Sequence, residues 1–239
     1  MAIHIMELNG KINNVVFYTR YGKNFARSKP RKYKRTNAMK VRSRNFGIAS
    51  SAARIIRMNL YKLIPFPKNK QMQSRFSSAV TKWIGSRDIQ DILPETDIVL
   101  LNDFQFNEAC RLQNRWKLSP VISNLSPGLL QLQLPAFTPM EAIIAPEHTV
   151  SVTLQVGVVA VKPGEAVPEK TISANLEIPF NDTQAGPYVI DLPVKTERGT
   201  LIITACALQF NVTERGNVNL VISDKPDYMP AAVVDARYC

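Results

Sequence analysis

Histidine and cysteine are scarce in this chain of 239 residues, which contains two histidines and three cysteines. His4 and His148 lie near no cysteine pair in the sequence. Two histidines are too few for a histidine-rich metal site and argue against a histidine-based catalytic triad. Cys110, Cys206 and Cys239 are odd in number and widely spaced, which excludes a disulfide framework and a CxxC metal knuckle. We expect Cys110 and Cys206 to be small core residues in a reducing compartment, the cytoplasm.

Long hydrophobic runs and well-known catalytic motifs are also missing. No stretch approaches the roughly 18 apolar residues of a membrane helix, and residues 1–10 do not resemble a signal peptide. The P-loop, GxGxxG, GxSxG and HExxH patterns do not occur. Asp88 with Asp91, or Asp97 with Asp103, are interpreted as a solvated acidic face rather than as catalytic pairs. The sequence therefore predicts no enzyme, no catalytic residue, no metal and no cofactor.

Acidic residues are nearly absent from the first part of the chain. Residues 1–90 contain 20 Lys/Arg and 2 Asp/Glu, a net charge of +18, whereas residues 91–239 contain 10 and 17, a net charge of −7. Such asymmetry indicates a basic portion that meets a polyanion and a remainder with another role. Nucleic acid is the favoured polyanion, and an acidic protein surface or an anionic membrane surface is the alternative.

The densest positive charge lies between Lys29 and Arg44, where eight of sixteen residues are cations and none is acidic. Lys and Arg that neutralise phosphates release counterions and so supply non-specific affinity. Tyr33 lies inside this segment, and Tyr18 and Tyr21 precede it, so a base could stack beside a phosphate contact. The alternative to a stacking role is that Tyr18 is simply the last residue of a β-strand.

Three local structures are expected in the first 90 residues. Residues 12–28 predict a β-hairpin, with a turn at 21–24. Pro30 disfavours a helix start, so residues 29–40 are expected to form an exposed arm. Apolar residues then recur at helical spacing from about 41 to 63, and a second helix is expected over about 70–84. The stripe of the first helix consists of Phe46, Ala49, Ala53, Ile56, Leu60 and Leu63.

From about residue 118 the apolar residues alternate with polar ones, as in β-strands that bury one face. Turn signals separate these runs, which predicts an antiparallel β-sandwich. The fold class is therefore α+β. The expected organisation is a basic hairpin, arm and helical region over 1–90, an acidic linker over 91–117 and a β-sandwich domain over 118–239.

The N-terminal quarter resembles a group of uncharacterised Bacteroidota proteins with the pattern GKI..VVFY...GK...RSKP followed by FG.AS. The matching residues are Gly10, Lys11, Val15, Val16, Phe17, Tyr18, Gly22, Lys23, Arg27, Pro30, Phe46, Gly47, Ala49 and Ser50. Asn13 stands where that group usually has glycine. The resemblance implies a shared architecture and no particular function. A basic arm before a β-sandwich is also similar to the layout of many viral coat proteins.

The favoured function is a non-enzymatic, nucleic-acid-associated structural protein whose β domain mediates assembly into a homo-oligomer. The nucleic acid is RNA or DNA. The expected nucleic-acid-binding residues are Lys29, Arg31, Lys32, Lys34, Arg35, Lys40, Arg42, Arg44, Arg54 and Arg57. The alternative is a self-assembling subunit of a shell, tube or filament, whose arm would contact the acidic segment 88–108 of a neighbouring subunit.

Overall fold

The computed structural model describes residues 9–20, 22–31, 34–85, 98–126, 128–194, 197–214, 217–221 and 225–239. The chain divides into two compact units, Met1–Lys40 and Val41–Cys239. The fold is mixed α and β, and each of its three sheets is antiparallel.

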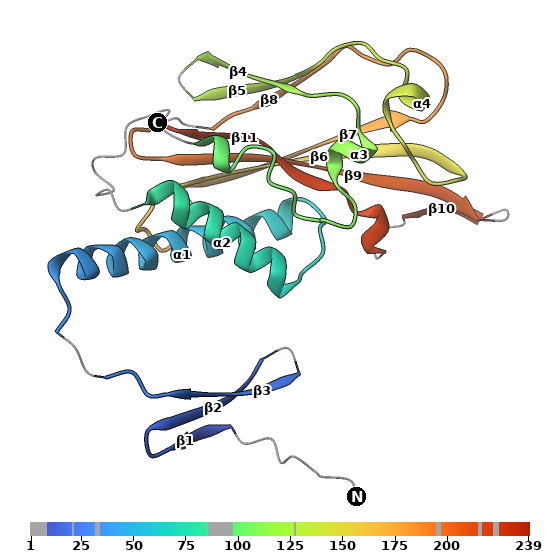
Figure 1. Ribbon diagram of the computed structural model, residues 1–239. Coiled ribbons are helices and arrows are strands. Elements are labelled where there is room, and N and C mark those ends of the chain that lie inside the picture. The colour runs from blue at the N-terminus through green and yellow to red at the C-terminus, as the bar shows by residue number, and fades with distance from the viewer. Residues whose placement is uncertain are drawn as a thin grey trace, which may run out of the picture. The chain divides into compact units, whose positions relative to one another are not determined.

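The N-terminal unit contains a three-stranded sheet in the order β1-β2-β3 (Figure 1). The strands are β1 (Gly10–Ile12), β2 (Val15–Arg20) and β3 (Lys23–Ser28). The predicted hairpin is correct for β2 and β3, but Ile12 belongs to an additional strand. The chain reverses at Asn13, whose φ of +53° lies in the left-handed region that asparagine tolerates.

The first long helix, α1 (Asn37–Leu63), begins before the expected start near residue 41. Thr36 provides the reason, because its hydroxyl accepts a hydrogen bond from the Met39 N–H at 3.3 Å. Such a side-chain acceptor satisfies a backbone N–H that has no partner within the helix. Lys40 is therefore helical, and its assignment to an extended arm was wrong.

The second long helix, α2 (Lys70–Ile84), has the predicted bounds. The Asn69 side chain accepts a hydrogen bond from the Met72 N–H at 2.6 Å at the start of the helix. Gly85 ends it with a φ of +61°, and its N–H donates to the Thr81 carbonyl at 2.9 Å. The predicted glycine stop is thus confirmed.

The C-terminal unit contains two further sheets. The five-stranded sheet has the order β10-β9-β6-β7, and β11 also pairs with β9. Its strands are β6 (Thr149–Val161), β7 (Lys170–Pro179), β9 (Leu201–Glu214), β10 (Asn217–Val221) and β11 (Ala231–Tyr238). The three-stranded sheet has the order β4-β5-β8, formed by β4 (Val121–Ser126), β5 (Leu129–Leu134) and β8 (Tyr188–Leu192). Short helical turns complete the described part of this unit: η2 (Ile98–Leu100) and α3 (Leu112–Arg115) lie between α2 and β4, α4 (Pro139–Ala142) lies between β5 and β6, and η3 (Pro226–Tyr228) lies between β10 and β11.

One face of the five-stranded sheet is covered by α1 and α2 (Figure 1). Ile56 of α1 and Phe76 of α2 are fully buried in one cluster with Val159 and Ile203 of the sheet. The predicted stripe of α1 is confirmed at its buried positions, but Phe46 is 60% exposed. The stripe packs on the sheet as well as on α2.

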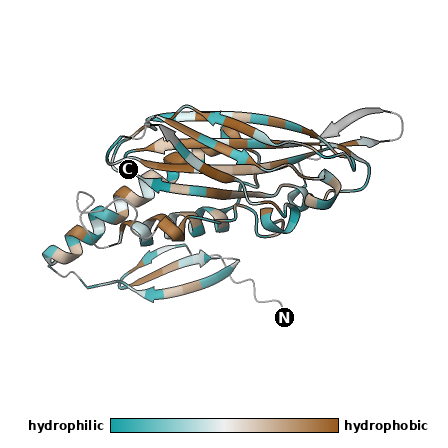
Figure 2. Ribbon diagram, turned by 90° about the horizontal axis from the view of Figure 1, so that it is seen from above, coloured by the Kyte–Doolittle hydropathy of each residue, from teal (hydrophilic) through white to brown (hydrophobic). Residues whose placement is uncertain are grey.

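The other face of the five-stranded sheet packs against the three-stranded sheet. Leu130 and Leu132 of β5 share a buried cluster with Leu154 of β6 and Phe210 of β9. The central strands β6 and β9 therefore bury both faces along much of their length, and Figure 2 shows long apolar stretches in the sheets. We expected each strand to bury one face only, and that expectation was wrong for these two strands. The chain's own helices cover the second face.

The expected acidic linker over 91–117 lies only partly within the described residues, which resume at Ile98. Within the part that is described, Glu108 forms ion pairs with Arg75 at 2.7 Å and with Arg111 at 3.2 Å. None of the helices in the described ranges is both long enough and apolar enough to cross a membrane.

Candidate nucleic-acid interface

The described residues in the first half of the expected binding segment are exposed to solvent. Lys29 continues from β3, and its backbone N–H donates to the Asn14 carbonyl at 2.6 Å. Arg31, Lys34 and Arg35 are exposed and belong to no helix or strand. Lys32 and Tyr33 lie outside the described residues, as does Tyr21.

The second half of the segment is helical. Lys40, Arg42 and Arg44 lie in the first turns of α1 and are exposed. The first turn of this helix contains no acidic residue. The partial positive charge of a helix N-terminus adds to the field of these cations, because no carboxylate offsets it. The predicted continuous arm is therefore wrong for its second half, which is the start of a helix.

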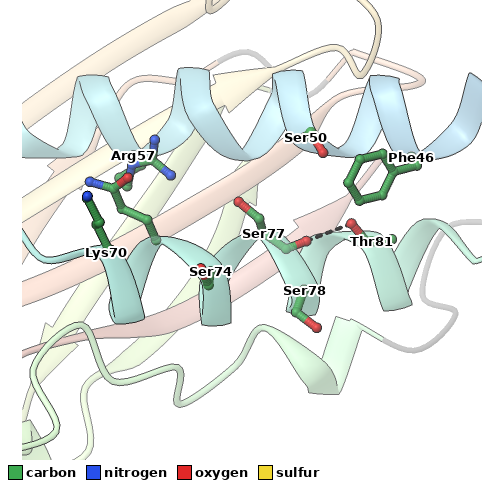
Figure 3. Close-up of a pocket in the computed structure, with 9 residues that line it drawn as sticks. Phe46, Ser50, Arg57, Lys70, Ser74, Ser77, Ser78 and Thr81 are labelled. Atoms are coloured by element: carbon green, nitrogen blue, oxygen red, sulfur yellow. Dashed lines mark hydrogen bonds between the residues drawn. The ribbon is translucent and has the colours of Figure 1, made fainter. Parts of the chain in front are cut away.

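Arg54 and Arg57 occupy different surroundings on α1. Arg54 is exposed, whereas Arg57 is half-buried and lines a groove between α1 and α2. Figure 3 shows Arg57 and Lys70 at one end of this groove and Phe46 at the other. Arg54 and Arg57 therefore have different surroundings, although they are three residues apart on α1.

The groove has a volume of about 700 Å³ and is lined by hydroxyl groups along α2. Its lining residues are Phe46, Ser50, Arg57, Lys70, Gln73, Ser74, Ser77, Ser78 and Thr81. The Thr81 hydroxyl is engaged within α2, where it donates to the Ser77 carbonyl at 2.7 Å (Figure 3). Two cations and a row of small polar side chains line this groove, so its chemistry suits an anionic or polar ligand. The lining residues do not specify which ligand that would be.

The β1–β2–β3 sheet carries a second set of cations that the sequence interpretation missed. Strand register pairs Val16 with both Lys11 and Arg27, and pairs Arg20 with Lys23. Residues that pair directly, or that are two apart on a strand, share one face of a sheet. These four cations therefore lie on one face, and all are exposed.

Two aromatic rings lie on the same face as these cations. Tyr18 pairs with Phe25 across β2 and β3, and their ring centroids are 5.6 Å apart with the planes 20° from parallel. The Arg27 guanidinium lies 5.8 Å from the centre of the Tyr18 ring. A two-residue turn after Arg20 would have predicted this register, so a signal for this face was present in the sequence.

No acidic residue occurs between Glu7 and Asp88. Arg75 forms an ion pair with Glu108, which lies outside this stretch. The positive field of the described cations in this part of the chain is therefore not neutralised by acidic neighbours in the same stretch.

Neither metal binding nor thiol chemistry finds support in the described residues. The residues placed in the structure contain no group of three or more His, Cys, Asp or Glu side chains that could hold a metal ion. Cys110 and Cys206 are buried, as predicted, and burial raises the pKa of both thiols. Both thiols stay protonated at neutral pH and are poor nucleophiles.

The chain matches no known family model, no curated protein and no solved structure. Its function is therefore inferred from the charges, rings and surfaces described above.

Proposed function

We propose that this protein is a non-enzymatic, nucleic-acid-associated structural protein. The observation that carries the proposal is the stretch of 80 residues between Glu7 and Asp88, which contains 20 Lys/Arg and no acidic residue. Nucleic acids present a dense row of phosphates, and a polyanion of that kind satisfies many exposed cations at once. We favour nucleic acid over an anionic membrane surface, because aromatic rings beside exposed cations can stack on bases while the cations bind phosphates.

Phosphate binding is assigned to the cations between Lys29 and Arg44, with Arg54 and Arg57 in support. Arg31, Lys34 and Arg35 are exposed and outside regular structure, so they can follow the backbone of a nucleic acid. Lys40, Arg42 and Arg44 add a positive helix start. Such contacts provide affinity without reading the base sequence.

The two facing sheets of the C-terminal unit are interpreted as a β-sandwich that mediates assembly into a homo-oligomer. β7 forms one end of the five-stranded sheet, and an edge strand offers backbone groups for pairing. The cytoplasm is the compartment that we propose, because its reducing conditions suit three free cysteines.

Salt dependence tests the phosphate contacts. If about six cations contact phosphates, the logarithm of the binding constant falls with the logarithm of salt with a slope of roughly −4 to −5. A variant with Arg31, Lys32, Lys34 and Arg35 changed to Ala should flatten this slope by about 3 and leave the fold intact. Fluorescence anisotropy with a homopolymeric RNA and a DNA duplex, between low and moderate salt, measures both values.

A control variant removes the same number of positive charges from the C-terminal unit. Lys117, Lys170, Arg198 and Lys225 are exposed cations outside the proposed interface. Their combined change to Ala should leave the slope within about one unit of the parent value. Equal flattening by both variants would show that total charge governs binding, and the assignment to the basic segment would be abandoned.

A second candidate function is a self-assembling subunit of a shell, tube or filament. It is favoured by the apolar face of the β1–β2–β3 sheet, which is opposite the cationic one and carries Ile12, Val15, Phe17 and Ala26. Ile12 is 55% exposed and Val15 is 36% exposed. Such a face is suited to packing on another β surface, and a small sheet gains stability from a packing partner. Assembly through such contacts should persist at salt concentrations that release nucleic acid.

A further inference from the structure

One face of the β1–β2–β3 sheet, which we call the cationic face, combines six exposed side chains in three parallel rows. It consists of Lys11, Tyr18, Arg20, Lys23, Phe25 and Arg27. One row contains Lys11 and Arg27 on either side of Val16, the middle row contains Tyr18 and Phe25, and the last row contains Arg20 and Lys23. Successive rows on one face of a sheet are roughly 7 Å apart.

We propose that the cationic face binds single-stranded nucleic acid, with a base stacked against the Tyr18 and Phe25 pair and phosphates held by the cations on both sides. This inference rests on the proposed association with nucleic acid and assigns the kind of strand that the sheet accepts. Every base in a single strand has a phosphate before it and a phosphate after it. An aromatic row between two cationic rows matches that alternation of charge and ring.

The two aromatic rings are more exposed than core residues. Tyr18 is 37% exposed and Phe25 is 42% exposed, although their near-parallel rings are in contact range. A cross-strand aromatic pair stabilises a sheet, and this is the simplest structural role for the two residues. That role does not explain why cations lie on both sides of the pair.

The arrangement of charge also favours an external anion. Strand register places Lys11 and Arg27 on opposite sides of Val16, and Lys23 on the same face two residues before Phe25. Among the residues that the structure describes, the cationic face contains no acidic side chain. A phosphate bound between cations of different strands would form charge-assisted hydrogen bonds to both.

A single strand fits the cationic face better than a duplex. The bases of a duplex are stacked on one another and paired, so their faces cannot reach Tyr18 or Phe25. An unpaired strand exposes a π-face at every base, and stacking on a protein ring tolerates any base. Acidic proteins satisfy the cations but have no reason to require the rings.

The test compares the binding of parent and variant to each of three ligands, using the full chain: a 12-residue single strand, an abasic strand of the same length, and a duplex of the same length. Tyr18→Leu combined with Phe25→Leu removes the rings and keeps all four cations. We expect this variant to bind the single strand roughly 5- to 100-fold more weakly than the parent. Binding of the abasic strand and the duplex should change less than about 2-fold, because their contacts are made through phosphates.

Two further variants separate stacking from folding. Phe17→Leu makes the same kind of change on the opposite face of β2, and it should leave single-strand binding unchanged. Phe25→Trp enlarges the stacking ring, so its affinity for the single strand should equal or exceed that of the parent. Circular dichroism of each variant reports whether the fold is retained.

The outcomes distinguish this inference from the proposed function. If the double leucine variant binds the single strand as tightly as the parent, or if Phe17→Leu causes the same loss, the stacking assignment is wrong and phosphate binding stands. The stacking assignment is also wrong, and phosphate binding still stands, if the parent binds the abasic strand as tightly as the base-bearing strand. If the parent binds none of the three ligands at low salt, both the stacking assignment and the proposed function fail.

Discussion

Gly157 of β6 allows the end of α1 to lie directly on the five-stranded sheet. A Cβ atom added at this position would lie 3.0 Å from Leu63 Cβ, 3.3 Å from Ile64 Cγ2 and 3.4 Å from Leu60 Cδ2. Carbon atoms normally pack at about 3.5–4.0 Å. The nearest contact involves the Leu63 Cβ itself, so shortening that side chain to alanine would not relieve it. The helix end would have to move away from the sheet.

Gly157→Ala should therefore destabilise the protein, although alanine is usually favoured over glycine in a strand. Reduced backbone freedom alone would stabilise the variant by about 0.5–1 kcal/mol. Overpacking costs about 1–3 kcal/mol, because a retreat of α1 also opens gaps around Leu60 and Ile64. We expect a net loss of about 1–2 kcal/mol in the free energy of unfolding. Thermal unfolding monitored by circular dichroism should show a midpoint roughly 2–8 °C below that of the parent.

Gly47→Ala is the matched control, because it makes the same chemical change on α1 where no atom lies within 4 Å of the added Cβ. This exposed helical glycine should become more stable by about 0.5–1 kcal/mol as alanine. The two substitutions should thus shift the midpoint in opposite directions. If Gly157→Ala raises the midpoint as Gly47→Ala does, the end of α1 does not pack on β6 as described.

Three other changes test separate parts of the structure. Ile56→Ala should cost roughly 2–5 kcal/mol in chemical denaturation because it empties a fully buried site, and Ile56→Asp should cost more; an unchanged midpoint for Ile56→Asp would contradict the packing of α1. Arg237→Ala removes the partner of Asp235 at 2.7 Å and a hydrogen bond to the Ile122 carbonyl at 2.6 Å, which should cost about 1–3 kcal/mol at pH 7. Burial already raises the pKa of Asp235 while Arg237 lowers it, so this pKa should rise further in the variant. The difference in free energy of unfolding between the parent and Arg237→Ala should shrink from pH 7 towards pH 4, because the Asp235 carboxyl becomes protonated. A difference that grows on acidification would refute this account. Deleting residues 1–28 removes the β1–β2–β3 sheet, which should leave the C-terminal unit folded but convert an oligomer to a monomer on gel filtration. A full-length protein that is already monomeric at tens of micromolar would show that this sheet does not hold subunits together.

Local signals in the sequence were sufficient to predict the two long helices and several strands. Apolar spacing identified the buried stripe of α1 around Ala53 and Ile56, and Gly85 identified the end of α2. The alternation of Leu130 and Leu132 with glutamines predicted a strand with one buried face, and β5 has that pattern. These features depend on periods of 3.6 or 2 residues and on single capping residues, which neighbours along the chain determine.

Errors occurred where a residue's environment depends on a distant part of the chain. Phe46 continues the apolar stripe of α1, yet it lies beside the groove between α1 and α2 and remains exposed. One error had a local cause: the start of α1 was missed because Thr36, whose hydroxyl accepts from the Met39 N–H three residues later, was not recognised as a capping residue. Arg54 and Arg57 are one turn apart, and the position of α2 determines that only Arg57 lines the groove.

Long-range pairing determined the properties most relevant to function. The positive charge of residues 8–87 is evident from composition, because charge needs no fold to be counted. The division of the N-terminal sheet into a cationic face and an apolar face depends on register, since a slip of one residue would exchange the two faces. The burial of β6 and β9 on both faces depends on helices that lie about 100 residues earlier in the chain. Periodicity within a strand indicates which side chains share a face, but it carries no information about what will cover that face.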